Sequence, residues 1–206
     1  AEMLREALDN MELLCDGFDD NCGFRRMDTL RYADSEAGAQ TIRREYAMRR
    51  HNGMDVQLLS PLTAGDEFTF PIESGVYSRG FGGSVDPYRF VHEVTAAAAR
   101  AGARVFENTA VNTVQTDDGV TLECAREKTV RAQYAVVAAG MDTGRYCGGV
   151  DKPLTAYTVV TAPVPDFAGW RGPCLIHNEE TPSCYLGVTP DNRILIGSIG
   201  GALSGA

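Results

Sequence analysis

The segment from Gly82 to Gly140 constrains the fold of this chain more than any other part of the sequence. It opens with Gly-Gly-Ser-Val-Asp-Pro and closes with Tyr-Ala-Val-Val-Ala-Ala-Gly. Asp86 is a good N-cap because its carboxylate can accept hydrogen bonds from free backbone N–H groups, and Pro87 suits the first helical position. Apolar residues then recur with helical period up to Gly102, the expected C′ residue. The pattern predicts a helix over 87–101 whose small alanine face packs closely against a sheet.

Short apolar segments follow this helix and predict strands. Residues 104–107 are apolar enough for one strand, and a second is expected from Val111 to Thr116. Asp118-Gly119 is a hairpin signal, and alternating apolar residues at 120–124 follow it. The last segment, 130–139, is nearly all apolar, as expected of a strand that is covered on both faces. It ends on a glycine, where a backbone can approach a ligand closely.

The order of these pieces resembles the FAD-dependent oxidoreductases of the D-amino-acid oxidase type, which include glycine oxidase and sarcosine oxidase. The matching features are Gly-Gly-x-Val-Asp-Pro, the helix ending in Ala-Gly-Ala, Glu-Asn-Thr-Ala-Val at 107–111, and Val-Ala-Ala-Gly at 137–140. The resemblance implies an α+β fold, in which part of an FAD-binding lobe (helix, β-meander and strand) joins an antiparallel-sheet substrate domain.

The same resemblance implies how the chain is divided. Residues 1–81 would be the first part of the substrate domain, 82–149 a partial FAD-binding lobe, and 150–206 the second, truncated part of the substrate domain. Enzymes of this type hold the FAD pyrophosphate at a Gly-x-Gly-x-x-Gly turn and the helix that follows it. This chain has no such turn. We therefore expect an interior fragment of a larger flavoenzyme, inactive by itself, without FAD, and prone to self-association through the alanine face.

The resemblance also indicates which residues lie near FAD in the complete protein. The backbone of Val111 would meet the adenine end of the cofactor. Ala138, Ala139 and Gly140 would lie where the last strand approaches it, with Met141 just beyond. Small residues at the carboxyl end of a parallel strand leave room in the usual ligand crevice. The alternative is a buried strand that stops at a glycine.

The substrate implied by the resemblance is an amine or amino acid that gives up a hydride to FAD. Catalytic residues are not identified by any motif, but Tyr157, His177 and Tyr185 lie on predicted strands and could hydrogen-bond a substrate. Tyr77, in the aromatic and glycine-rich segment 71–83, is a further candidate. The alternative for the strand residues is that they are sheet residues with satisfied polar tips, and for Tyr77 that it is exposed in a loop.

An arginine usually grips the carboxylate of such a substrate, because its guanidinium offers two parallel donors. Glycine oxidase-like chains carry an arginine in the turn before the last predicted hairpin strand, where this chain has Thr189. This departure does not favour a glycine-like substrate. Arg193, in the same turn, is expected to be solvated.

The remaining segments read as ordinary secondary structure. An apolar stripe over residues 3–14 predicts a helix packed into the core, and 35–52 a second helix. The arginines of this second helix are expected to form a solvated face that pairs with Glu36 and Glu45. Strands are predicted at 24–27, 29–33, 56–59, 156–161, 175–177, 184–188 and 194–198.

Composition excludes several classes of function. The net charge of −9 opposes binding to nucleic acid. No apolar run is long enough to span a membrane, and no signal peptide is visible, so we expect a cytoplasmic protein. The six cysteines form no Cys-x-x-Cys pair, and with three histidines they give no zinc spacing. We expect reduced thiols and no metal site.

Two other functions remain open. The chain could be a non-catalytic binding domain that retains the fold, and a Gly-x-Gly-x-x-Gly turn upstream in the native reading frame would exclude this. It could also belong to a glycerol-3-phosphate dehydrogenase-like flavoenzyme, which a substrate screen of the complete enzyme would decide.

Overall fold

The computed structural model describes residues 2–148, 156–178, 180 and 183–199. The chain divides into two compact units, residues 1–97 with 155–206 and residues 98–154. The first holds a seven-stranded mixed sheet and the second a three-stranded antiparallel sheet, which confirms the α+β class. Their assignment as substrate domain and FAD-binding lobe, with boundaries at residues 82 and 150, stays a prediction.

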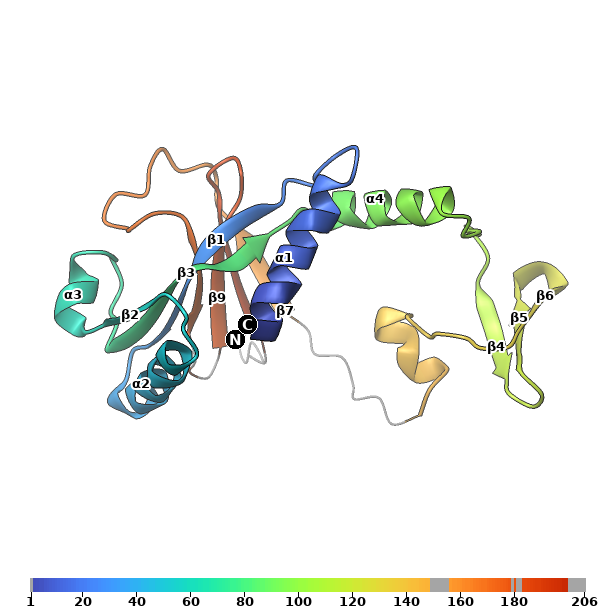
Figure 1. Cartoon of the computed structure of the whole chain (residues 1–206), viewed down its shortest axis with the longest axis horizontal. Helices are drawn as coiled ribbons and strands as arrows, with labels where there is room; N and C mark the ends of the chain where they lie inside the picture. The colour runs from blue at the N-terminus through green and yellow to red at the C-terminus, as the bar shows by residue number, and fades with distance from the viewer. Residues whose placement is uncertain (1, 149–155, 179, 181–182, 200–206) are drawn as a thin grey trace, which may run out of the picture. The chain divides into compact units, whose positions relative to one another are not determined.

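Most of the secondary structure belongs to the first unit (Figure 1). Its elements are α1 (Glu2–Asp16), β1 (Arg25–Ala33), α2 (Glu36–His51), β2 (Val56–Leu59), α3 (Pro61–Gly65), β3 (Ser74–Ser84), β7 (Ala156–Val160), β8 (Cys174–Asn178), β9 (Ser183–Val188) and β10 (Ile194–Ile199). Helix α4 (Pro87–Arg100) continues into the second unit, which has β4 (Val111–Gln115), β5 (Val120–Cys124), η1 (Ala125–Glu127), β6 (Lys128–Ala132) and η2 (Gly140–Arg145). None of the helices in the described ranges is both long and apolar enough to cross a membrane.

The large sheet joins the beginning of the chain to its end. Its strand order is β2-β3-β1-β8-β9-β10-β7. Neighbouring strands run antiparallel except for β1 and β8, which are parallel with Leu30 beside Ile176 and Arg31 beside His177. The predicted hairpin at residues 189–192 is confirmed as the connection between β9 and β10.

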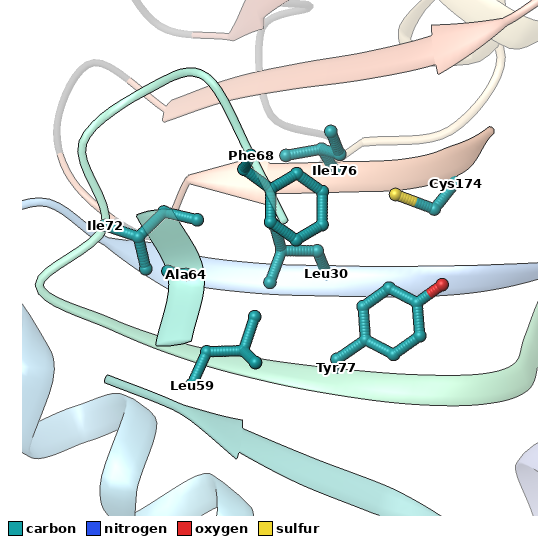
Figure 2. Close-up of a cluster of buried hydrophobic side chains, with 8 residues drawn as sticks. All are labelled: Leu30, Leu59, Ala64, Phe68, Ile72, Tyr77, Cys174 and Ile176. Atoms are coloured by element: carbon teal, nitrogen blue, oxygen red, sulfur yellow. The ribbon is translucent and has the colours of Figure 1, made fainter. Parts of the chain in front are cut away.

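One face of this sheet carries the main hydrophobic core. Leu30, Tyr77 and Ile176 project from β1, β3 and β8, and each is at most 4% exposed. Figure 2 shows the ring of Phe68 lying against these strands, together with Leu59, Ala64, Ile72 and Cys174. Since successive residues of a strand point to opposite faces, the residues directly before and after each of these three must face the other side of the sheet.

The opposite face is covered only in part. Helix α2 packs Ile42 against Ala33 of β1 and Val76 of β3, and all three are fully buried. Farther along the sheet, Gly187 and Gly197 have no side chains, so this face carries little bulk there. A methyl group at Gly197 would lie 2.1 Å from the ring of Tyr185, so that ring lies directly over this glycine.

The predicted helix boundaries are confirmed by their caps. Ser35 is the N-cap of α2, and its hydroxyl accepts a hydrogen bond from the Gly38 N–H at 3.2 Å. The Asp86 carboxylate accepts from the backbone N–H groups of Tyr88 and Arg89 at 2.9 and 3.1 Å, which starts α4 as expected. Gly102 follows α4 with φ +99°, a conformation that glycine adopts readily.

The segments around Asp28 and Tyr77 differ from the predictions. The two short strands expected at 24–27 and 29–33 are one strand, β1, with a register irregularity between Met27 and Thr29. The expected loop within 71–83 is β3, which pairs with β1 and β2. Its glycines suggested a loop, but Gly82 lies so close to Thr29 and Leu175 that a side chain there would collide with them.

Of the strands predicted in the second unit, one is absent and one is shorter than expected. Residues 104–107 form no strand, and the strand expected over 130–139 ends with β6 at Ala132. Val136 is 92% exposed, although the segment was expected to be covered on both faces. An apolar composition alone does not make a strand, because a strand needs a neighbour that takes up its backbone hydrogen bonds. No described strand pairs with residues 133–139.

Two predicted packing faces are also exposed. Of the α1 stripe, Met3 and Leu14 are 83% and 45% exposed, Leu8 and Met11 are half-buried, and only Cys15 is buried in that helix. Helix α4 buries none of its residues, so its alanine face does not pack against a sheet in the described part of the chain. Helical period predicted these helices correctly, but period reveals an apolar face and not what covers it. Self-association through the alanine face stays a prediction.

Replacement of Gly197 by alanine tests whether the open sheet face needs a glycine beneath the Tyr185 ring. The new methyl group meets the Tyr185 ring, so the ring must rotate away and lose its contact with Thr158. We expect Gly197→Ala to lower the free energy of unfolding by about 1–3 kcal/mol in urea titrations. Gly187→Ala is the matched control, because its methyl group would meet Leu175 at an ordinary 3.7 Å. Equal stability of the two variants would contradict this packing.

Candidate functional site

A cavity of about 860 Å³ lies on the open face of the large sheet. Its walls come from β1, β3, β8, β9 and β10, from the Cys22-Gly23 turn, from α1 and α2, and from the first residues of α4. All of these lie in the first unit. The volume is within the range of about 300–1,000 Å³ that is typical of small-molecule sites.

Strand alternation explains which side chains reach this cavity. Thr29 and Arg31 of β1 lie beside Leu175 and His177 of β8, and all four line the cavity. Leu30 and Ile176, between them in sequence, also belong to the cavity lining, but their side chains pack into the core on the other face. Tyr185 of β9 is the register partner of His177, so the parallel pair and the next hairpin place these polar groups side by side.

Two of the four predicted substrate-side residues, His177 and Tyr185, line the cavity together. The Nε2 atom of His177 and the Ser183 hydroxyl are 3.0 Å apart, and that hydroxyl also donates to the Asn178 carbonyl. The Tyr185 hydroxyl is 3.1 Å from the Thr158 hydroxyl. These bonds fix the direction of both rings, and the Tyr185 hydroxyl can take part in a further hydrogen bond to a ligand.

The other two candidates lie elsewhere. Tyr77 is 4% exposed in the main core, and its hydroxyl donates to Asp28 Oδ2 at 2.7 Å. Burial, reinforced by the Asp28 carboxylate, raises the pKa of Tyr77 well above its usual value. Tyr157 on β7 is 55% exposed and is not among the residues that line the cavity. Tyr77 does not line this cavity, because strands distant in sequence bury it in the core. A contact between Tyr77 and the substrate stays a prediction.

Cys174 lies in the same core and is not a nucleophile at neutral pH. Its side chain is fully buried. Burial, followed by the nearby Asp28 carboxylate, raises the pKa of the thiol to about 12. The thiolate, which is the reactive form of cysteine, is therefore scarce at this position.

Arg49 is a cavity residue that the sequence analysis assigned to a solvated helix face. Its Nη1 donates to the Ser78 hydroxyl at 2.7 Å and its Nη2 pairs with Glu45, while Arg31 Nη1 pairs with the same Glu45 carboxylate at 2.8 Å. The side chains of Arg49 and Glu45 are only 13% and 12% exposed.

The predicted solvated role holds for another arginine of α2 but not for Arg49. Arg43 pairs with Glu36 at 2.9 Å, with side chains 47% and 64% exposed. Arg49 instead continues the buried stripe of Ala39, Ile42 and Tyr46, at helical spacings of three and four residues. This spacing was the sequence signal that could have revealed its inward position.

The turn between β9 and β10 reaches the cavity through Thr189 but not through Arg193. Thr189 lines the cavity, and its hydroxyl donates to Asp191 at 2.6 Å. Arg193 Nε pairs with Asp191 at 2.6 Å, and its side chain is 40% exposed. Arg193 is thus only partly solvated, since its Nη1 also donates to the Thr161 carbonyl at 3.3 Å. Its charge is directed at Asp191 within the turn.

The second unit has a smaller hollow of about 250 Å³ that collects three of the predicted cofactor residues. Val111, Ala138 and Ala139 line it, and the Tyr146 hydroxyl donates to the Val111 carbonyl at 2.8 Å. Gly140 and Met141 begin η2 and are not in its lining, and Met141 is 83% exposed. A contact between these five residues and FAD stays a prediction.

Comparison with known proteins supplies the family. The family model described as FAD dependent oxidoreductase (DAO) matches residues 1–204. No significant match was found among curated proteins.

Solved structures share the fold. L-proline dehydrogenase from P. horikoshii matches with a TM-score of 0.75 at 16% identity, covering 98% of this chain and 56% of that one. Glycine oxidase from Geobacillus kaustophilus matches with a TM-score of 0.70 at 24% identity, covering 97% of this chain and 54% of that one. Iminodiacetate oxidase from Chelativorans sp. BNC1 matches with a TM-score of 0.72 at 17% identity, covering 99% of this chain and 58% of that one. The chain thus spans little more than half the length of these enzymes.

Identities this low establish the fold alone. The family model rests on the sequence and covers nearly all of the chain. It agrees with the resemblance carried by the Gly82–Gly140 segment, and it indicates FAD as the cofactor. This protein belongs to the DAO family of FAD dependent oxidoreductases.

Proposed function

We propose that the complete protein oxidises a small amine or amino acid by transferring a hydride to FAD. The observation that carries this proposal is the cavity of about 860 Å³, whose mostly apolar lining includes His177, Tyr185 and Arg49. Ligand sites of this kind combine apolar walls with a few polar groups that set the orientation of the substrate. FAD supplies the redox chemistry when bound, and the protein positions the substrate carbon against it.

The described residues fit part of FAD only. The hollow beside Val111, Ala138 and Ala139 holds about 250 Å³, below the roughly 300–1,000 Å³ of sites for whole drug-sized ligands. Its small side chains suit one end of the cofactor. We therefore expect residues 1–206 alone to bind FAD weakly and to be inactive, which a flavin titration of this chain would test. A cytoplasmic location likewise stays a prediction.

His177 and Tyr185 are proposed to hydrogen-bond the substrate. Both rings are already oriented by Ser183 and Thr158, so binding requires little further loss of side-chain freedom. Leu175 and Leu195 form apolar cavity wall nearby. Such walls exclude water and strengthen the polar contacts that do form.

Arg49 is proposed to hold the carboxylate of the substrate. Its guanidinium has five N–H donors, and the bonds to Glu45 and Ser78 use two of them. Those same bonds fix the plane of the guanidinium at the cavity wall. A carboxylate that accepts from a fixed arginine forms a strong and directional contact. This arrangement would serve in place of an arginine at the Thr189 position.

Flavin absorbance of the complete native protein tests the proposed function. We expect purified protein to be yellow, and an added amine or amino acid to bleach the flavin band without oxygen. A screen of amines, amino acids and glycerol 3-phosphate then identifies the substrate class. A folded, colourless protein that takes up no FAD would contradict the proposal and favour a binding domain.

Replacement of Arg49 by lysine tests the carboxylate contact. Lysine keeps the charge but loses the planar fork. We expect KM for a carboxylate substrate to rise about 10- to 100-fold, since a hydrogen bond to a charged group is worth about 1.5–3 kcal/mol. The value of kcat should fall less.

Arg43→Lys is the matched control on the same helix, because Arg43 pairs with Glu36 at the exposed surface. It should leave KM unchanged. Urea unfolding of both variants separates a folding defect from a binding defect. An equal rise in KM for the two variants would count against a specific role of Arg49.

A further inference from the structure

Two rows of residues cross the strands on the open face of the large sheet. Residues that are neighbours in the register point to the same face, and so do residues two positions along each strand. The first row is polar, with Arg31 on β1, His177 on β8 and Tyr185 on β9. The second row lies two residues along each strand, about 7 Å away. Its members, all in the cavity lining, are Thr29, Leu175, Gly187 and Leu195.

The second row is open above Gly187. Among the described residues, a methyl group built on Gly187 would meet only Leu175, at 3.7 Å, while Leu195 is the register partner on the other side. The other glycine of this face, Gly197, differs because the Tyr185 ring already fills the space above it. We call the space bounded by Leu175, Gly187 and Leu195 the leucine recess.

The position of Arg49 sets the distance from the proposed carboxylate contact to this recess. Its guanidinium donates to Ser78 on β3, and Ser78 is the register partner of Thr29 in the second row. Leu175 lies one strand farther along this row and Gly187 two strands, with neighbouring strands about 4.8 Å apart. A ligand held at Arg49 must therefore extend across β8 to reach the leucine recess.

Charged groups beyond the second row are already paired within the chain. Asp86 caps α4 by accepting two backbone N–H groups, Arg89 pairs with Asp20, and Thr189 donates to Asp191. Apolar lining continues on this side with Phe81, Val85 and Pro190. A charged side chain placed here would lose its water without gaining a partner, which is costly. The surroundings of the leucine recess therefore favour an apolar group.

We propose that the leucine recess binds the apolar side chain of the substrate, and that the substrate is an amino acid whose side chain is as long as that of leucine or norleucine. The inference rests on the proposed function, because it takes the carboxylate contact at Arg49 as one end of the ligand. Glycine or alanine held at Arg49 would leave Leu175 and Leu195 in contact with water. Burial of this apolar surface is what favours the longer side chain. Gly187 is then a specificity-determining residue.

Binding of straight-chain carboxylic acids tests the leucine recess in the complete native protein with its FAD. The series from acetate to hexanoate keeps the carboxylate but has no amine to oxidise. Isothermal titration calorimetry gives the dissociation constant of each acid. We expect this constant to fall about fourfold per added methylene group, the usual effect of removing one from water. Equal dissociation constants for acetate and hexanoate would overturn the recess.

Gly187→Val fills the leucine recess. We expect hexanoate to bind this variant about 10- to 100-fold more weakly, the effect of two or three methylene groups, and acetate to lose far less. Gly65→Val is the matched control, because Gly65 is outside the cavity lining and a methyl group there meets nothing within 4 Å. It should bind hexanoate as the native protein does. Equal weakening of acetate and hexanoate by Gly187→Val would overturn the role of Gly187.

Oxidation of an amino-acid series separates this inference from the proposed function. Glycine and both enantiomers of alanine, norvaline and norleucine would be offered to the complete protein, and bleaching of the flavin without oxygen followed. We expect kcat/KM to rise about fourfold per methylene group up to norleucine. A flat or falling series would overturn the inference and leave the proposed function intact. Flavin that no amino acid or amine reduces would contradict the proposed function, and the acid series would still decide the recess.

Discussion

The parallel pairing of β1 with β8 is the interaction on which the rest of the structure depends. The other strand pairs of the large sheet lie within the first part of the chain or within its last part, whereas this one joins the two. A parallel pair has no hairpin turn to set its register. Leu30 and Ile176, neighbours in the register and almost fully buried, fix it from the core side. A slip by one residue would bury Arg31 and expose Leu30.

The same pairing divides the sheet into two faces with different roles. The core face is filled by large side chains and by Phe68 from the segment after α3 (Figure 2). The other face has glycines where a full core would need bulk, so it stays open and its polar residues line a cavity. Arg31, His177 and Tyr185 meet there only because three strands are in the correct register. The core face thus stabilises the fold while the open face is available for binding.

The sequence predicted well the features that depend on near neighbours. The cap at Asp86 and the hairpin at residues 189–192 each need only a few adjacent residues, and both are present. The prediction of a strand over 130–139 was wrong beyond Ala132, because a strand needs a pairing partner that composition does not reveal. Tyr77 was misplaced for the same reason, since its burial comes from β1 and β8.

The candidate site was predictable only in part. His177 and Tyr185 were found because they lie on predicted strands, but their proximity depends on the β8–β9 register. Arg49 was grouped with its exposed neighbours, although its spacing from Ile42 and Tyr46 places it on the buried side of α2. The involvement of FAD came from the resemblance to a family, and no single residue of the described chain would have indicated it.

The central claim is that the open face of the large sheet forms the substrate wall. It is tested most directly by a crystal structure of the complete protein with FAD and acetate, the simplest carboxylate probe. We predict acetate in the cavity with its carboxylate on Arg49, between the flavin ring and the strands that carry His177 and Tyr185. A flavin ring on the Phe68 side of the sheet, or acetate bound only outside this cavity, would contradict the account.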